Sequence, residues 1–188
     1  MRRYKKYSDD KLIAIVAASK EPEKSMAFSE IYDRYGSKIY LYCRKVFGEG
    51  SFAEDIFQET FIQLLKSIEN DVKINSIKGY LLITARNLSI NFKRKNKVET
   101  VEFNDLMHLF NDRTYEMKEL DQLVDSALDL LPEKHKEAFI LQVYNGLSYS
   151  EIANITNVPL TTVRNRVVRA KYKLREILTP ILQEKNKG

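Results

Sequence analysis

The sequence predicts an all-α protein with two small helical domains, the second containing a helix-turn-helix, joined by a flexible linker. The 188-residue chain contains only 6 Gly and 4 Pro, too few for a turn-rich β protein. Apolar residues recur at spacings of three and four in several stretches, as in amphipathic helices. An acidic segment, with 7 acidic and 2 basic side chains, interrupts a chain whose net charge is +5. We therefore expect domains at 1–97 and 123–188 and a linker at 98–122.

The composition excludes several classes of protein. One Cys cannot form an intrachain disulfide, and one Cys with two His offers too few ligands for a structural zinc site. No stretch reaches the roughly 18 consecutive apolar residues of a membrane span, and the basic N-terminus lacks the apolar core of a signal peptide. We therefore expect a cytoplasmic protein. The sequence has no glycine-rich phosphate loop and no nucleophile motif, so we assign no catalytic, cofactor-binding or metal-binding residue.

Three helices are predicted in the first domain. They cover residues 26–47, 51–68 and 77–95, with a polar loop at 69–76 between the last two. Gly48 and Gly50 end the first helix, and a capping box of Ser51 and Glu54 opens the second. The apolar side of the third helix is expected to contain Tyr80, Leu81, Ile83, Thr84, Leu88 and Phe92. Cys43, on the first helix, is predicted to be a buried small hydrophobe.

Four helices are predicted in the second domain. They cover residues 123–131, 132–144, 148–156 and a long stretch from the Thr161-Thr162 pair to about 178. Asn145 and Gly146 end the second of them, and a capping box of Ser148 and Glu151 opens the third. One of the two threonines is expected to cap the long helix, whose narrow apolar face contains Val163, Val167, Ala170 and Leu174.

The short helix, the turn and the long helix together predict a helix-turn-helix that binds duplex DNA. Asn157 suits the turn because Asn tolerates the left-handed conformation, and Pro159 cannot continue the preceding helix. Six basic residues and no acidic one lie between 164 and 175, a pattern that attracts phosphates. The residues expected to meet the duplex are Thr161, Thr162, Arg164, Asn165, Arg166 and Arg169. A solvated amphipathic helix is the alternative, but the capped helix and the turn favour DNA binding.

Three stretches of this sequence resemble a bacterial sigma factor of RNA polymerase, of the extracytoplasmic-function (ECF) group. FAEDIFQETFIQLL at 52–65 resembles the family's polymerase-binding helix, and YLLITARNLSINFKRKNK at 80–97 resembles its promoter-melting helix. Residues 131–176 resemble its C-terminal DNA-binding domain. The two parts stand in the family's order and are separated by a short linker. The resemblance implies region 2 of a sigma factor in the first domain and region 4 in the second.

The resemblance also implies roles for individual residues and partners. Asp55, Gln58 and Glu59 would meet the clamp helices of the β′ subunit, although a solvated face is the alternative. The loop at 70–77 and the third helix would capture an unstacked base of the upstream melted promoter element. The residues implied there are Lys78, Arg86, Asn87, Asn91 and Arg94. Many family members carry Asp where this chain has Asn91, so the negative charge is absent. The implied partners are core RNA polymerase, through the β′ clamp helices and the β flap, promoter DNA and an anti-sigma factor.

Two other functions are open from the residues alone. A stand-alone helix-turn-helix regulator would bind duplex DNA without polymerase, as a dimer. An enzymatic function is much less favoured than either DNA-binding function, because acidic pairs such as Glu54 and Asp55 are better explained by helix capping.

Overall fold

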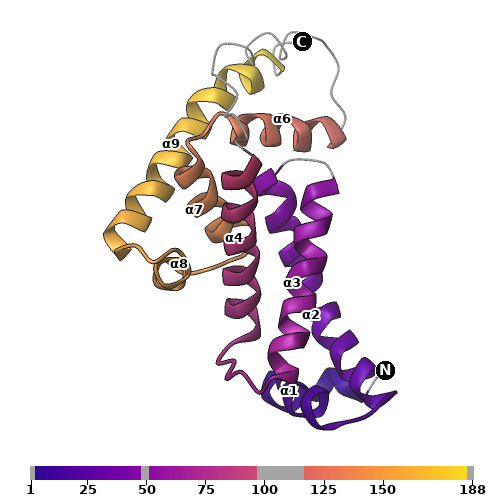
Figure 1. The fold of residues 1–188 in the computed structure, drawn as a ribbon. Coiled ribbons are helices and arrows are strands. Elements are labelled where there is room, and N and C mark those ends of the chain that lie inside the picture. The colour runs from indigo at the N-terminus through magenta and orange to yellow at the C-terminus, as the bar shows by residue number, and fades with distance from the viewer. Residues whose placement is uncertain (1–2, 48–50, 97–116, 186–188) are drawn as a thin grey trace. The chain divides into compact units, whose positions relative to one another are not determined.

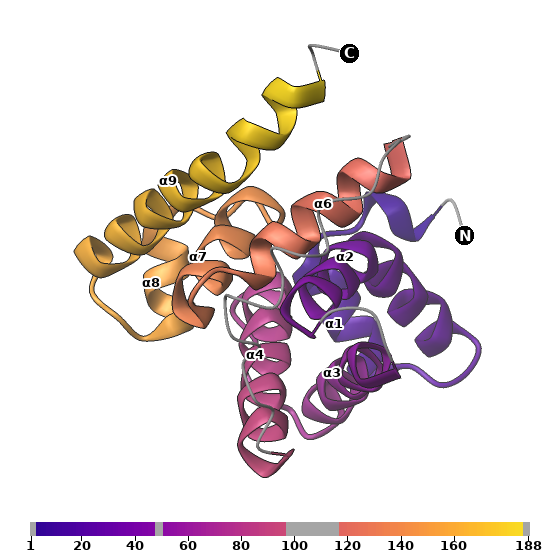
Figure 2. The same cartoon turned by 90° about the horizontal axis from the view of Figure 1, so that it is seen from above.

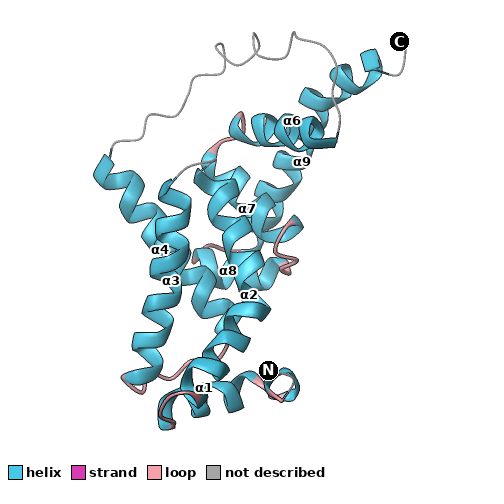
Figure 3. Ribbon diagram, turned by 90° about the vertical axis from the view of Figure 1, so that its right-hand side faces the viewer, coloured by secondary structure: helices cyan, strands magenta, loops and turns pink. Residues whose placement is uncertain are grey.

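The computed structural model describes residues 3–47, 51–96 and 117–185, and these residues form helices with no strand among them (Figures 1 and 3). The contacts divide the chain into two compact units, Met1–Lys95 and Asn96–Gly188. The predicted all-α class is therefore confirmed. Each unit is described by itself below.

The first unit contains a short 3-10 helix η1 and four α-helices. Their bounds are η1 Tyr4–Lys6, α1 Asp9–Ala18, α2 Glu23–Phe47, α3 Ser51–Glu69 and α4 Ile77–Asn96. The predicted loop between α3 and α4 is confirmed. The stop predicted at Gly48 and Gly50 lies outside the described residues, as does the side chain of Ser51, on which the predicted cap depends.

Helix α1 was not predicted from the sequence. The Ser8 side chain caps it by accepting a hydrogen bond from the Lys11 backbone amide at 3.3 Å. Leu12 and Val16, four residues apart, are buried against α2 and α3. Figure 1 shows α1 across the end of the unit where α2 begins. Two apolar positions in a charged segment were too weak a periodic signal to predict this helix.

Packing of α4 corrects one expectation for the core of the first unit. Ile77, Leu81, Leu82 and Ala85 are fully buried. Ile83, which we expected on the apolar side, has an exposed fraction of 41%. At 100° per residue, Leu81 and Ala85 lie about 160° from Ile83, so a helix that buries them must turn Ile83 outward.

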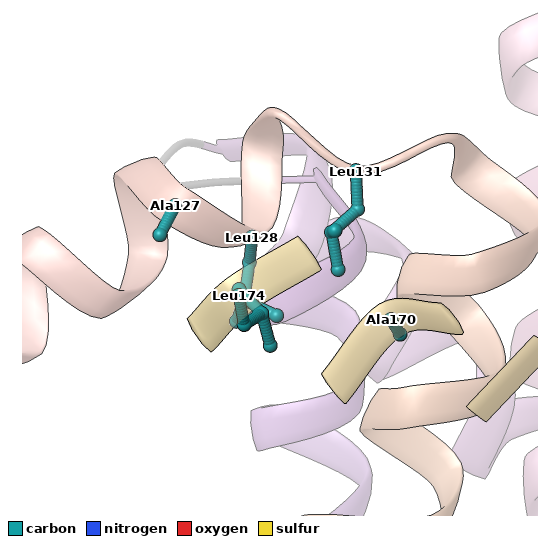
Figure 4. Packing of buried hydrophobic residues seen from close by; sticks show 5 residues of the cluster. All are labelled: Ala127, Leu128, Leu131, Ala170 and Leu174. Atoms are coloured by element: carbon teal, nitrogen blue, oxygen red, sulfur yellow. The ribbon is translucent and has the colours of Figure 1, made fainter. Parts of the chain in front are cut away.

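The second unit contains helices α6 Met117–Asp129, α7 Glu133–Val143, α8 Tyr149–Thr156 and α9 Leu160–Lys185. Its core contains a cluster in which residues of α6 and the turn after it meet α9 (Figure 4). The cluster consists of Ala127, Leu128, Leu131, Ala170 and Leu174. Helices α7 and α8 pack on other parts of α9 (Figure 2). The long helix therefore serves as the scaffold of this unit.

In the second unit, predicted helix ends are wrong for α6 and α9. Helix α6 begins at Met117, inside the predicted linker, because the apolar spacing of Val124 and Leu128 continues backward to residues 117 and 120. The remainder of that linker, 98–116, lies outside the described residues.

Helix α9 also differs at both ends. It begins at Leu160 rather than after a threonine cap, and the Val163 amide donates to the carbonyl oxygen of Pro159 at 3.1 Å. The fixed φ of proline suits such a helix start. At the other end the helix runs through Pro180 to Lys185 instead of stopping near 178. A proline removes one backbone donor, which the last turns of this helix tolerate.

Candidate protein- and nucleic-acid-binding surfaces

The helix-turn-helix is fixed by two local features that the sequence predicted. Ser148 and Glu151 form the capping box: the Glu151 amide donates to the Ser148 side-chain oxygen at 3.3 Å, and the Ser148 amide donates to the Glu151 carboxylate at 2.8 Å. Asn157 ends α8 with φ 53°, in the left-handed region. The Val158 amide donates to the Ala153 carbonyl at 3.2 Å, which closes the turn. Both predictions are confirmed, and they set the direction in which α9 leaves the turn.

The buried face of α9 leaves its other sides for solvent. Val163, Val167, Ala170 and Leu174 are buried, as predicted. Of the residues expected to meet duplex DNA, the structure exposes Thr161, Arg164, Asn165 and Arg169, and it half-buries Thr162 and Arg166. By helical geometry Thr162, Asn165, Arg166 and Arg169 share one side of α9. Arg164 lies about 160° around the helix from Arg166, on the opposite flank.

His135 of α7 is influenced by the side of α9 that carries Arg166 and Arg169. Burial, followed by the positive charges of Arg169 and Arg166, lowers the pKa of His135 below its ordinary value. His135 is half-buried in the first turn of α7. The sequence could not reveal this, because His135 and the two arginines lie far apart in the chain.

The polar side of α3 carries the three residues implied in polymerase binding. Asp55 and Gln58 are exposed and Glu59 is half-buried, whereas Ile56 and Leu64 face the core. The Gln63 side-chain amide donates to the Glu59 carboxylate at 3.1 Å and so restrains it. The three side chains therefore lie together on one side of a well-packed helix.

Helix α4 brings most of the residues implied in melted-DNA binding to one side. Asn87, Asn91 and Arg94 are exposed, and Arg86 is half-buried beside them. Lys78 is half-buried and lies on a different side of the helix by its position in the turn. No acidic residue occurs between 77 and 96, whereas five basic residues do. The surface around α4 therefore favours an anionic partner.

Between α2 and α3 lies a hollow of about 430 Å³ that the sequence did not predict. Its aromatic wall is formed by Phe57 with Tyr32 and Tyr40, whose ring centroids lie 5.7 and 5.5 Å from that of Phe57. Gly36 forms part of the lining, and a Cβ there would meet the Tyr32 ring at 3.5 Å. Asp33 supplies a carboxylate at the hollow.

A polar network holds the N-terminal segment on α2. The Arg34 guanidinium donates to the carboxylates of Glu30 at 2.8 Å and Asp9 at 3.1 Å. It also donates to the carbonyl oxygens of Tyr4 at 3.1 Å and Lys5 at 3.2 Å. The Glu30 hydrogen bond raises the pKa of Arg34, so the group stays charged. Its fork of donors thus ties η1 and α1 to α2.

Cys43 has the environment predicted for it. Its side chain is fully buried, and burial raises the pKa of the thiol to about 12. Within the described part of the chain, no group of three or more His, Cys, Asp or Glu side chains is arranged to hold a metal ion. Nor does any helix among those residues have the length and apolarity to cross a membrane.

Family models match both units. The model described as Sigma-70 region 2 matches residues 31–99, and the one described as Sigma-70, region 4 matches residues 121–174. Together they span about two thirds of the chain.

Curated relatives match most of the chain. The ECF RNA polymerase sigma factor SigW of Bacillus subtilis is 29% identical over 166 residues, covering 81% of this chain and 89% of the relative. SigM of the same organism is 27% identical over 156 residues, covering 81% of this chain and 95% of the relative. The ferric citrate uptake sigma factor FecI of Escherichia coli is 28% identical, covering 78% of this chain and 87% of the relative.

Solved structures share the fold. The chain matches CnrH, solved in complex with the cytosolic domain of CnrY, with a TM-score of 0.67 at 22% identity, over 92% of this chain and 97% of that one. It matches the sigma factor RpoE of Bartonella quintana, solved with the anti-sigma factor NepR, with a TM-score of 0.65 at 23% identity, over 81% and 96% of the two chains. With regions 2 and 4 in order and ECF relatives along most of its length, the chain belongs to the sigma-70 family, as an ECF sigma factor that directs transcription initiation.

Proposed function

We propose that the two units act as separate modules that perform different steps at a promoter. The observation that carries this proposal is the contrast between exposed side chains of α3, α4 and α9. Those of α3 include carboxylates, α4 has no acidic residue, and α9 combines arginines with hydroxyl and amide groups. Three chemically different surfaces on well-packed helices suit a protein partner, melted DNA and duplex DNA, respectively.

The polymerase-binding surface is proposed to be the side of α3 formed by Asp55, Gln58 and Glu59. Carboxylates and an amide spaced three and four apart can pair with arginine and amide side chains of a partner helix. The partner would be the β′ clamp helices of core RNA polymerase. The buried face of α3 keeps these groups at fixed positions, so little ordering is needed on binding.

The duplex-binding surface is proposed to be the side of α9 formed by Thr162, Asn165, Arg166 and Arg169, with Thr161 and Arg164 near the helix start. Arginine pairs with guanine edges and asparagine with adenine edges in a major groove, and the threonine hydroxyls suit phosphates. The melted-DNA surface is proposed to be the side of α4 that carries Asn87, Asn91 and Arg94, next to the loop at 70–76. The amides would bind base edges and the arginine a phosphate.

In this proposal the protein performs no covalent chemistry, and polymerase supplies the reaction. We further propose that an anti-sigma factor regulates the protein. This rests on the likeness in fold to the RpoE protein solved with the anti-sigma factor NepR. The partner would compete for surfaces that polymerase uses.

The test is promoter-directed transcription with core polymerase and two double variants that serve as each other's controls. R166A/R169A should lose duplex promoter binding and keep its affinity for core, whereas Q58A/E59A should weaken core binding by about tenfold and keep duplex affinity. K171A/R175A, which removes the same charge from the other flank of α9, should retain most duplex affinity. Loss of core affinity in R166A/R169A would contradict the assignment, as would a protein that supports no initiation.

A further inference from the structure

Two exposed isoleucines lie on the solvent side of α4. Ile83 and Ile90 have exposed fractions of 41% and 45%. They are seven residues apart, so they lie on the same side of the helix, and Asn87 lies between them at spacings of four and three. The opposite side buries Leu81 and Ala85 completely. The pair therefore lies on the side of α4 that faces away from the fully buried residues and is partly open to solvent.

A single exposed apolar residue needs no explanation, but this arrangement does. The neighbouring Leu81 and Leu82 are fully buried, whereas Ile83, which is equally apolar, is left partly exposed. The stripe continues to Arg94, four residues beyond Ile90. It thus alternates apolar, amide, apolar and cationic side chains along one line: Ile83, Asn87, Ile90 and Arg94.

Charge narrows the kind of partner that fits this stripe. Helix α4 carries five basic residues and no acidic one, so its partner must be anionic and must also offer apolar surface. Single-stranded nucleic acid has both properties, because its phosphates are anionic and the faces of its bases are exposed. In a duplex those faces are hidden by stacking, and the grooves present base edges whose only apolar group is the thymine methyl.

Isoleucine is also suited to hold bases apart. Proteins that distort DNA insert apolar side chains, isoleucine among them, between base steps and so offset part of the cost of unstacking. The branched β-carbon leaves isoleucine one preferred rotamer in a helix, so the apolar edge is held in place before DNA arrives.

We propose that Ile83 and Ile90 form an apolar wedge that packs against unstacked bases at the upstream edge of the melted promoter. Asn87, between them, hydrogen-bonds to a base edge, and Arg94 binds a phosphate. The inference deepens the function proposed above for α4 and rests on it. It assigns promoter opening to apolar contacts as well as to the polar groups of this helix.

The test compares promoter opening with DNA supplied already open. A promoter is first selected from random-sequence duplexes by transcription with core RNA polymerase and the wild-type protein; failure of this step would reject the proposed function itself. Holoenzyme with I83S/I90S is then assayed on that duplex and on the same sequence with a mismatched bubble at the melted positions. Opening is followed by the fluorescence of 2-aminopurine placed in the bubble.

We expect I83S/I90S to reduce opening of the duplex promoter by about tenfold, as loss of two partly buried apolar contacts implies. Transcription from the pre-melted template should be within twofold of wild type. I83V/I90V, which keeps the branched apolar shape, should open the duplex nearly as wild type does. V143S, which removes a branched residue of 47% exposed fraction from α7, is the matched control and should have no effect on opening.

Three results would overturn the proposal. Normal opening by I83S/I90S would show that DNA does not use the stripe. Equal losses on the duplex and pre-melted templates would exclude a role in unstacking. Reduced affinity for core polymerase would assign the stripe to an acidic, apolar segment of a protein instead. Because both side chains face solvent, the serine variants should fold, and an unchanged circular dichroism spectrum checks this.

Discussion

Helices α4 and α9 are both basic, yet their exposed sides differ in a way that matches two states of DNA. On α9, Asn165 and Arg169 lie on a side with hydroxyl and amide groups, which can read base edges in a closed groove. The apolar residues that α9 exposes, Val168 and Tyr172, are adjacent to Arg169 and three residues beyond it. On α4, Ile83 and Ile90 alternate with Asn87 and Arg94. Apolar side chains gain little from the polar edges of a duplex but can pack on the faces of separated bases. Under the proposed function, both basic helices would attract phosphates, and the residues between the charges would decide which form of DNA each helix binds.

The largest effect should come from breaking the duplex-reading side. R166A/R169A should reduce affinity for the duplex promoter by roughly a hundredfold or more, since each arginine that pairs with a base edge contributes about 1–3 kcal/mol. The slope of log affinity plotted against log salt concentration should also become less steep. The change should be up to about 2 if both arginines displace counterions from phosphates. If the variant loses as much affinity for random duplexes as for the promoter, relative to wild type, these arginines bind phosphates only.

A smaller effect should come from the amide in the α4 stripe. Asn87→Ala should reduce promoter opening by about tenfold through the loss of a hydrogen bond to a base edge, while duplex affinity stays unchanged. Opening can be measured with permanganate, which oxidises unpaired thymines. A parallel loss of duplex affinity would remove the distinction between the two helices.

A third prediction concerns the capping box at the start of α8. Ser148→Ala should destabilise α8 by about 1 kcal/mol, because the helix loses its N-cap acceptor. Hydrogen exchange followed by mass spectrometry should become faster in α8 peptides and stay unchanged in α3 and α4. Ser148→Asp retains an acceptor and should restore protection; faster exchange in both units would mean that they are not independent.

The smallest effect is a pH dependence confined to the second unit. In the folded protein the pKa of His135 is lowered by burial and by Arg169 and Arg166, so the unfolded state binds its proton more readily. The stability of this unit should therefore fall as pH drops below the ordinary histidine pKa of about 6.5, until the folded form is protonated as well. The described residues of the first unit contain no histidine. Denaturant unfolding of His135→Gln should lack this decline; an unchanged decline would assign it to other groups.

Sequence periodicity was sufficient for the elements that bury one clear face. The narrow face of α9, the loop before α4 and the capping box at Ser148 were all predicted and are all present. Periodicity did not predict the exposure of Ile83. Three consecutive apolar residues at 81, 82 and 83 cannot all face the core from one side of the helix, and only the packing of the helices decides which of them is exposed. Periodicity also failed at Pro180, where a breaker near a helix end is tolerated.

The surfaces were harder to predict than the helices. Spacing alone placed Asp55, Gln58 and Glu59 on one side of α3, but their role came from the resemblance to a family and stays a prediction. The hollow between α2 and α3 and the network around Arg34 join residues far apart in the chain, so no local pattern could reveal them. Long-range contacts of this kind depend on how the helices pack.

The central claim is that α9 acts on closed promoter DNA and α4 on open DNA. The most direct measurement is the ratio of transcription from a pre-melted template to transcription from a duplex template. It is made for R166A/R169A and I83S/I90S holoenzymes side by side, on templates with and without the duplex element that α9 is proposed to bind. We expect pre-melting alone to rescue I83S/I90S, and we expect R166A/R169A to be impaired only on templates that contain the duplex element bound by α9. Identical responses of the two variants to pre-melting would contradict it.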